Sequence, residues 1–179
     1  MNTMAPSLTV SPDTIRMTSA LLYSMPNMEA CCFWFGARSP SGTAFVSGIV
    51  IPRQLNNRGH YHVEARAMVE VANVARARGW KNLAQVHSHP GPEVTHSGYD
   101  DEMANSRRAL SLVFPKYGYM PGMWHFRGWL CRIWPVVLPD EIGVHAFLDG
   151  KWGRLNRAAA CAALNVAAGP RPELIDLRP

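Results

Sequence analysis

The chain has 179 residues, of which 47% are hydrophobic and 17% charged, and its formal net charge is +5. This length is typical of one domain with a single core, and the composition excludes a disordered or fibrous chain. No stretch approaches the roughly 20 apolar residues that cross a bilayer, and the first residues lack a secretory signal pattern. We therefore expect a soluble, cytoplasmic protein with no membrane partner.

Cysteine usage gives no sign of a disulfide framework or a zinc ribbon, because no C-x-x-C pair is present. The four cysteines are one adjacent pair and two isolated residues: Cys31, Cys32, Cys131 and Cys161. We expect reduced and mostly buried thiols. The positive charge favours an acidic partner, but the basic residues are scattered along the chain, as on solvated helix faces. We therefore expect the partner to be an acidic face of a protein substrate rather than a nucleic acid.

In chain order, residues 1–11 carry no clear period and predict a flexible N-terminal arm. Ser11 followed by proline predicts a helix start, with the helix extending to about Tyr23. Apolar runs from Ala30 to Phe35 and from Ala44 to Ile51 flank a Gly/Ser/Pro-rich turn and predict a β-hairpin. The first third of the chain is thus a helix followed by two strands.

Apolar residues at three- and four-residue spacing predict a helix over residues 63–79, ended by a glycine. Residues 83–87 predict a strand, and Ser97 is expected to open a helix that continues to about Ser111. Further strands are expected over residues 112–114, 124–137 and 144–148. The alanine-rich residues 155–168 predict a last helix, and residues 169–179 an irregular tail. The sequence therefore predicts one α/β domain over residues 12–168, with a mixed curved sheet flanked by helices.

His87 and His89 are two residues apart on an expected strand, so both side chains point to one face and can reach one metal ion. After a seven-residue loop, Ser97-x-x-Asp100 brings a carboxylate back from the first turn of a helix. Two imidazoles and one carboxylate are a common catalytic zinc set that leaves one position open for water. The alternative for Ser97 and Asp100 is a helix capping box. If Asp100 binds the metal instead, Asp101 and Glu102 in the same first turn can satisfy the helix dipole.

Hydrolysis of an amide at such a site also needs a group that accepts the proton of the water and passes it to the departing amine. Three glutamates precede the site: Glu29, Glu64 and Glu70. The last two lie on the expected helix over residues 63–79 and are most simply solvated. Glu29 lies between a helix-stopping proline and an apolar strand, which favours a position facing a polar cavity.

Other residues have simpler explanations. His60 and His62 form a second His-x-His pair, but no acidic or cysteine partner follows at a comparable spacing, which disfavours a second metal site. His96 is expected to be an exposed loop histidine. The aromatic residues between Trp124 and Trp129 fit strand packing better than base stacking.

The pattern of Glu29 before an apolar strand, then His87-Ser88-His89, seven residues, Ser97 and Asp100, resembles the JAMM (Jab/MPN) metalloproteases. The likeness covers roughly residues 12–150. It implies one Zn²⁺ held by His87, His89 and Asp100, Glu29 as general acid/base, and Ser97 as a hydroxyl that helps to hold the oxyanion. The implied fold is a mixed sheet with cytidine-deaminase-like layering.

The resemblance also implies a substrate class. A small chain of this family looks like the bacterial and archaeal members, so we expect an isopeptidase or peptidase acting at the C-terminus of a ubiquitin-like protein. The tail would bind as an added extended strand, with cognate activating or conjugating enzymes as further partners and antiviral defence as one setting. Processing of a sulfur-carrier protein and a non-catalytic interaction module remain the alternatives. The loops over residues 53–59 and 90–96 are expected to set specificity.

Overall fold

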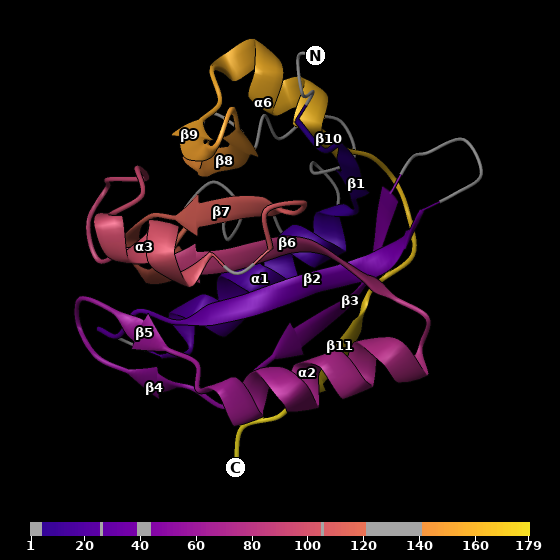
Figure 1. Ribbon diagram of the computed structural model, residues 1–179, viewed down its shortest axis with the longest axis vertical. Helices are drawn as coiled ribbons and strands as arrows, with labels where there is room; N and C mark the ends of the chain where they lie inside the picture. Colours follow the sequence, from indigo (N-terminus) through magenta and orange to yellow (C-terminus); the bar gives the residue numbers. More distant parts are fainter. Residues whose placement is uncertain (1–4, 26, 39–43, 105, 121–140) are drawn as a thin grey trace.

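The computed structural model describes residues 5–25, 27–38, 44–104, 106–120 and 141–179. Within these residues the chain forms a mixed nine-stranded sheet and a two-stranded hairpin (Figure 1). The strands are β1 (Leu8–Val10), β2 (Cys31–Arg38), β3 (Ala44–Ile51), β4 (Leu55–Asn56), β5 (Tyr61–His62), β6 (Lys81–Ser88), β7 (Leu110–Phe114), β8 (Gly143–Leu148), β9 (Lys151–Arg154), β10 (Leu164–Val166) and β11 (Glu173–Asp176). The helices are α1 (Pro12–Tyr23), α2 (Ala65–Ala77), α3 (Gly98–Met103), the 3₁₀ turn η1 (Lys116–Gly118) and α6 (Arg157–Ala163).

The sheet order is β10-β1-β3-β2-β6-β7-β8-β9, and β11 pairs with β3 beside β1. Parallel and antiparallel pairs occur together, for example β6 with β7 and β2 with β6. The central strands β2 and β6 cross the middle of the molecule, with α2 on one side (Figure 1). The predicted α/β class, a mixed sheet flanked by helices, is confirmed.

Alternate residues of β2 point to opposite faces of the sheet, as strand geometry requires. Phe33 packs in a buried cluster with Val71 of α2, whereas Trp34 packs in a second cluster with Leu22 of α1. The indole Nε1 of Trp34 donates to Thr18 Oγ1 of α1 at 2.9 Å. The two helices therefore cover the two faces of the sheet, and β2 lies between them.

Several predicted elements are confirmed. The hydroxyl of Ser11 accepts a hydrogen bond from Thr14 N at 3.2 Å and caps α1. The predicted hairpin is the antiparallel pair β2-β3. α2 ends before Gly79, whose φ of 67° is in the left-handed region that favours glycine. The proposed strand over residues 124–137, with its aromatic run and Cys131, lies outside the described residues.

The predicted loose arm is wrong for Leu8–Val10, which form the buried strand β1. β1 pairs in parallel with β3 on one side and with β10 on the other. The predicted last helix over residues 155–168 is too long, because α6 ends at Ala163 and the chain continues as β10. Pairing with β1 outweighs the helix propensity of this alanine-rich stretch.

Two further boundaries differ from the prediction. The helix that follows Ser97 ends at Met103 rather than near Ser111, because Ser111 belongs to β7, a fully buried strand that pairs with β6. The predicted irregular tail contains β11, which pairs with residues 48–51 of β3. In both places, backbone pairing in the sheet replaces the expected local structure.

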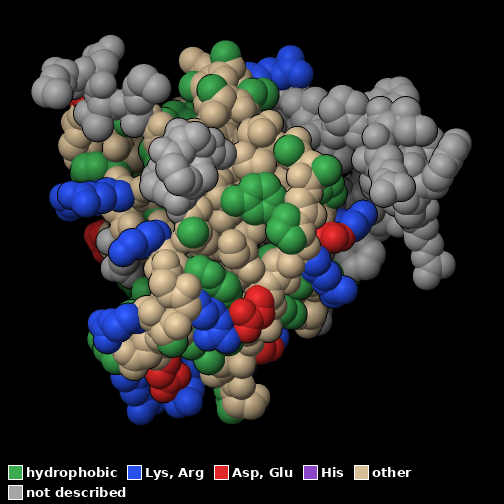
Figure 2. Space-filling view, turned by 90° about the vertical axis from the view of Figure 1, so that its right-hand side faces the viewer, with side chains coloured by type: hydrophobic (Ala, Val, Ile, Leu, Met, Phe, Trp, Pro, Cys, Tyr) green, Lys and Arg blue, Asp and Glu red, His purple; other side chains and the backbone are tan. Residues whose placement is uncertain are grey.

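The surface carries its charges in dispersed form. On the face shown in Figure 2, Lys and Arg side chains are spread among apolar and acidic ones, and no histidine of the described residues is visible there. Within the part of the chain that the structure describes, no helix has the length and apolar character to span a membrane.

Candidate metal centre

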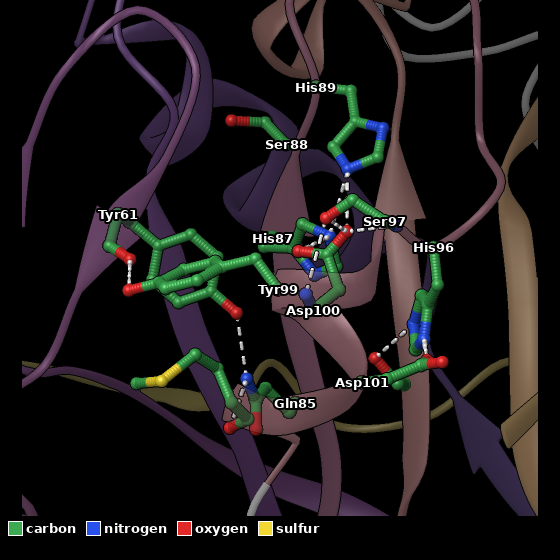
Figure 3. Close-up of polar contacts among 12 residues, drawn as sticks. Tyr61, Gln85, His87, Ser88, His89, His96, Ser97, Tyr99, Asp100 and Asp101 are labelled. Carbon is green, nitrogen blue, oxygen red and sulfur yellow. Dashed lines mark hydrogen bonds and ion pairs between the residues drawn. The ribbon is translucent and has the colours of Figure 1, made fainter. Parts of the chain in front are cut away.

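His87, His89 and Asp100 converge at the end of β6. His87 is the last residue but one of β6, His89 follows the strand, and Asp100 lies in the first turn of α3. The Nε2 atoms of the two histidines are 3.2 Å apart; Asp100 Oδ1 is 3.2 Å from His87 Nε2, and Oδ2 is 3.2 Å from His89 Nε2. In Figure 3 these side chains point toward one another. The predicted ligand set is therefore brought together.

The donor atoms have the spacing that a tetrahedral ion needs. Zinc bonds of about 2.0–2.1 Å to nitrogen and oxygen imply ligand atoms roughly 3.3 Å apart. The two Nε2 atoms have about this separation, each lies 3.2 Å from a different oxygen of Asp100, and one ligand atom from each residue lies within 4.8 Å of the others. Among the described residues, this is the one group of three or more His, Cys, Asp or Glu side chains arranged to hold a metal ion. The residues fit a single Zn²⁺ with a fourth position for water.

Glu29 is brought to the same face of the sheet by the pairing of β2 with β6. Cys31 is in register with His87, and Ser88 N donates to Ala30 O at 3.0 Å just beyond it. Continuing this antiparallel register places Glu29 opposite His89. Its side chain is buried, and burial raises its pKa to about 7, with His89 opposing the rise and Asp100 adding to it.

The backbone of Glu29 is fixed by the β4-β5 hairpin. Its N–H donates to Asn57 O at 2.8 Å, and Asn56 Nδ2 donates to its carbonyl at 2.6 Å. The loop around residues 53–59, predicted to affect substrate access, therefore also holds the backbone of Glu29.

Ser97 caps α3 and contacts the metal-site carboxylate at the same time. Its hydroxyl donates to Asp100 Oδ2 at 2.8 Å, its N–H donates to the same oxygen at 2.7 Å, and Asp100 N is 3.2 Å from its Oγ. The capping-box and metal-ligand interpretations of this pair are therefore compatible, because Asp100 serves both. A role for Ser97 at an oxyanion requires its hydroxyl to leave Asp100.

Comparison with known proteins identifies the family. Residues 16–131, more than half of the chain, match the family described as prokaryotic homologs of the JAB domain. The chain belongs to the prokaryotic JAB family. The resemblance drawn from the sequence motif is thereby confirmed. None of the curated proteins compared with this JAB-family chain matches it significantly.

Two solved structures with TM-scores above 0.5 show the same fold at low sequence identity. A solution structure of a protein from Desulfitobacterium hafniense has a TM-score of 0.62 at 16% identity, covering 90% of this chain and 94% of that one. A solution structure of a protein from Salinibacter ruber has a TM-score of 0.51 at 16% identity, covering 83% and 88%. A crystal structure of a JAB1/MPN domain protein from Archaeoglobus fulgidus has a TM-score of 0.46 at 12% identity, covering 90% and 98%.

The electrostatics of the JAB-family site keep Asp100 ionised. Burial raises the pKa of Asp100, but hydrogen bonds from the two imidazoles outweigh it and hold the pKa well below its usual range. Burial lowers the pKa of His87, which favours the neutral ring that a metal ligand needs. Burial also lowers the pKa of His89, but its hydrogen bond to Asp100 and the charges of Asp100 and Glu29 raise it overall.

The side chain of His96 is buried, not exposed as predicted. Its side chain is 5% exposed, with Nδ1 2.8 Å from Asp101 Oδ1 and Nε2 2.9 Å from Ser111 Oγ. Its ring stacks on that of His145, with centroids 3.9 Å apart. The sequence placed it in a loop correctly, but its partners come from α3, β7 and β8, and their proximity has no local sequence signal.

A second group of polar contacts attaches α3 to β5 on the other side of the site. The hydroxyl of Tyr99 donates to Tyr61 O at 3.0 Å and lies 3.3 Å from His62 Nδ1. The buried ring of Tyr61 lies 5.4 Å from that of His87, and its hydroxyl accepts from Gln85 Nε2 at 2.8 Å (Figure 3). Tyr61, Gln85 and Tyr99 were not among the sequence candidates.

The remaining sequence candidates lie outside the cluster. His60 is exposed and contacts Asn57, and neither it nor His62 belongs to a metal-binding group among the described residues. Glu64 and Glu70 form ion pairs with Arg66 and Arg53, in keeping with the solvated roles predicted for them. Of the described cysteines, the adjacent pair in β2 is buried and Cys161 is exposed; all are free thiols.

Proposed function

We propose that the protein is a zinc-dependent isopeptidase or peptidase that removes or processes a ubiquitin-like protein at its C-terminus. The observation that carries the proposal is the convergence of His87, His89 and Asp100 at 3.2 Å spacing, with Glu29 opposite His89. Two imidazoles and one carboxylate with an open position are typical of catalytic rather than structural zinc. As the setting we propose a bacterial ubiquitin-like conjugation pathway, with antiviral defence as one role; membership of the prokaryotic JAB family supports the metal site itself.

When bound, zinc would lower the pKa of its water and polarise the scissile carbonyl. Glu29 would accept the proton of the attacking water and deliver it to the departing amine as the C–N bond breaks. Burial raises the pKa of Glu29 to about 7 in the metal-free site, and the charge of a bound ion would lower it, which favours the carboxylate form that accepts a proton. Ser97 would turn its hydroxyl from Asp100 toward the developing oxyanion.

The substrate tail would lie in extended form beside the site. The β4-β5 hairpin is a two-stranded ribbon next to the backbone of Glu29, and the edge of such a ribbon is where an extended tail would add as a further strand. The positive net charge favours an acidic face on the substrate or on a cognate activating or conjugating enzyme.

The test incubates the zinc-loaded protein with fusions of candidate ubiquitin-like proteins and reads the products by mass spectrometry. Cleavage after the ubiquitin-like C-terminus by the parent, and none by Glu29→Gln with zinc still bound, is the expected result. Cleavage restricted to a sulfur-carrier precursor would move the function to sulfur-carrier processing. Zinc binding without cleavage of any fusion, with or without candidate partner enzymes, would favour a non-catalytic module.

A further inference from the structure

His96 and Asp101 flank the capping box on its two sides. His96 precedes Ser97, Asp101 follows Asp100, and the distance from His96 Nδ1 to Asp101 Oδ1 is 2.8 Å. Because an ionised carboxylate only accepts hydrogen bonds, the Nδ1–H of His96 donates. This contact is a second link between the residues that precede α3 and its first turn, in addition to the capping box formed by Ser97 and Asp100.

The other ring nitrogen of His96 attaches this assembly to the sheet. With the proton on Nδ1, Nε2 of the neutral ring accepts from the hydroxyl of Ser111 at 2.9 Å. Ser111 is buried in β7 and is in register with Gln85 of β6, two residues before His87. One side chain thus connects α3, which carries Asp100, to β7, the neighbour of the strand β6 that carries His87.

The ring itself is held by packing. It stacks on His145 of β8 at 3.9 Å with an interplanar angle of 17°, and the ring of Trp152 lies 5.7 Å away. Gly143 allows the loop to approach β8, because a Cβ there would lie 2.0 Å from Val94 O. The ring of His96 therefore has little freedom to turn; its contact with Asp101 is drawn in Figure 3.

We infer that His96 is a positioning residue that sets the orientation of Asp100 relative to His87 and His89. The inference rests on the proposed metal site. His96 does not itself bind the ion, because Asp101 and Ser111 occupy both of its ring nitrogens. Groups that hydrogen-bond directly to a ligand change metal affinity by about 10- to 100-fold when they are removed, and we expect an effect within this range for His96, which acts through Asp101 and Ser111.

The experiment measures the zinc dissociation constant by chelator competition and the visible absorption spectrum of the cobalt-loaded protein, which reports ligand geometry. His96→Ala should raise the dissociation constant about 10- to 100-fold and shift the cobalt bands. His96→Asn, whose amide N–H takes the place of Nδ1–H, should recover affinity and the parental spectrum. Asp101→Ala should resemble His96→Ala, and the double variant should bind no more weakly than either single variant.

Glu102→Ala is the matched control, because it removes an exposed carboxylate from the same helix and should leave affinity and spectrum unchanged. Equal losses for Glu102→Ala and Asp101→Ala would overturn the inference, since charge alone would then explain the effect. Parental affinity and spectrum in His96→Ala would overturn it while leaving the proposed function intact. Absence of metal binding by the parent would overturn both. If His96→Ala does not fold in its metal-free form, Asp101→Ala and His96→Asn decide the question.

Discussion

At the scale of single residues, Asp100 contacts both histidines of the site as well as Ser97. One oxygen faces His87, and the other accepts from Ser97 and faces His89. A carboxylate held by so many donors stays ionised, which is the form that binds a cation. The contacts of Ser97 therefore bear on metal affinity as well as on helix stability.

Replacing Ser97 with alanine should affect stability and metal binding together. We expect the free energy of unfolding of the metal-free protein to fall by about 1 kcal/mol through loss of the cap, and zinc affinity to weaken. Denaturant unfolding and chelator competition measure the two effects. Ser97→Thr, which keeps the hydroxyl, is the control; equal zinc affinity in parent and Ser97→Ala would contradict the expectation.

His145 should make the stability of the protein depend on pH. Burial lowers its pKa to about 3, with nearby His96 and His87 adding to the effect. The native state therefore favours the neutral ring, so this stabilisation is fully present above about pH 6.5 and is lost as pH falls toward 3. The free energy of unfolding should fall by at most about 1.4 kcal/mol per pH unit in that window.

The matched variant is His145→Phe, which keeps a ring against His96. Neither nitrogen of His145 has a hydrogen-bond partner among the described residues, so phenylalanine sacrifices no bond there. Denaturant unfolding between pH 4 and 8 should give a shallower pH dependence for this variant. Parallel curves for parent and variant would rule out His145 as the source.

The ligand residues could be predicted from sequence because they lie in one short stretch with fixed spacing. The side chains of His87 and His89 point to the same face, and Asp100 lies in the first turn of the helix that follows. The surroundings of His96 could not be predicted, because Ser111 and His145 come from strands whose pairing is decided by the whole sheet.

At the scale of elements, the hairpin β2-β3 and the helices α1 and α2 followed their local patterns, since caps and apolar periodicity coincide there. The alanine-rich stretch over residues 155–168 did not follow its local pattern. Helix propensity favours helix across residues 155–168, but β1 offers unpaired backbone groups that Leu164–Val166 satisfy. Local propensity cannot reveal a partner that lies at the other end of the sequence.

Leu164 tests this assignment. It is buried at 2% exposure in β10, so Leu164→Ala should lower the free energy of unfolding by about 2–5 kcal/mol through lost burial and a cavity. The neighbouring Asn165 is exposed on the same strand, and Asn165→Ala should change stability by less than about 0.5 kcal/mol. Equal effects in denaturant unfolding would argue against a buried β10.

At the scale of the whole molecule, metal binding should be linked to folding. An ion that binds only the native state raises its stability by about 2.7 kcal/mol at a free concentration 100 times the dissociation constant. Zinc should therefore raise the melting temperature of the parent, and a chelator should reverse the rise. His89→Ala and Asp100→Ala should show no such increase; a full zinc effect in either variant would exclude that residue as a ligand.

The place of β11 in the sheet has a consequence for biosynthesis. Residues 48–51 of β3 are an apolar strand segment whose outer edge is paired by Glu173–Asp176. A growing polypeptide makes this edge early and its partner strand only after nearly all the rest of this sequence has been translated. Until then the edge is a template for pairing with other nascent chains. Holdase chaperones should therefore improve the yield of soluble protein, and removal of residues 173–179 should cause aggregation even though no metal ligand is lost.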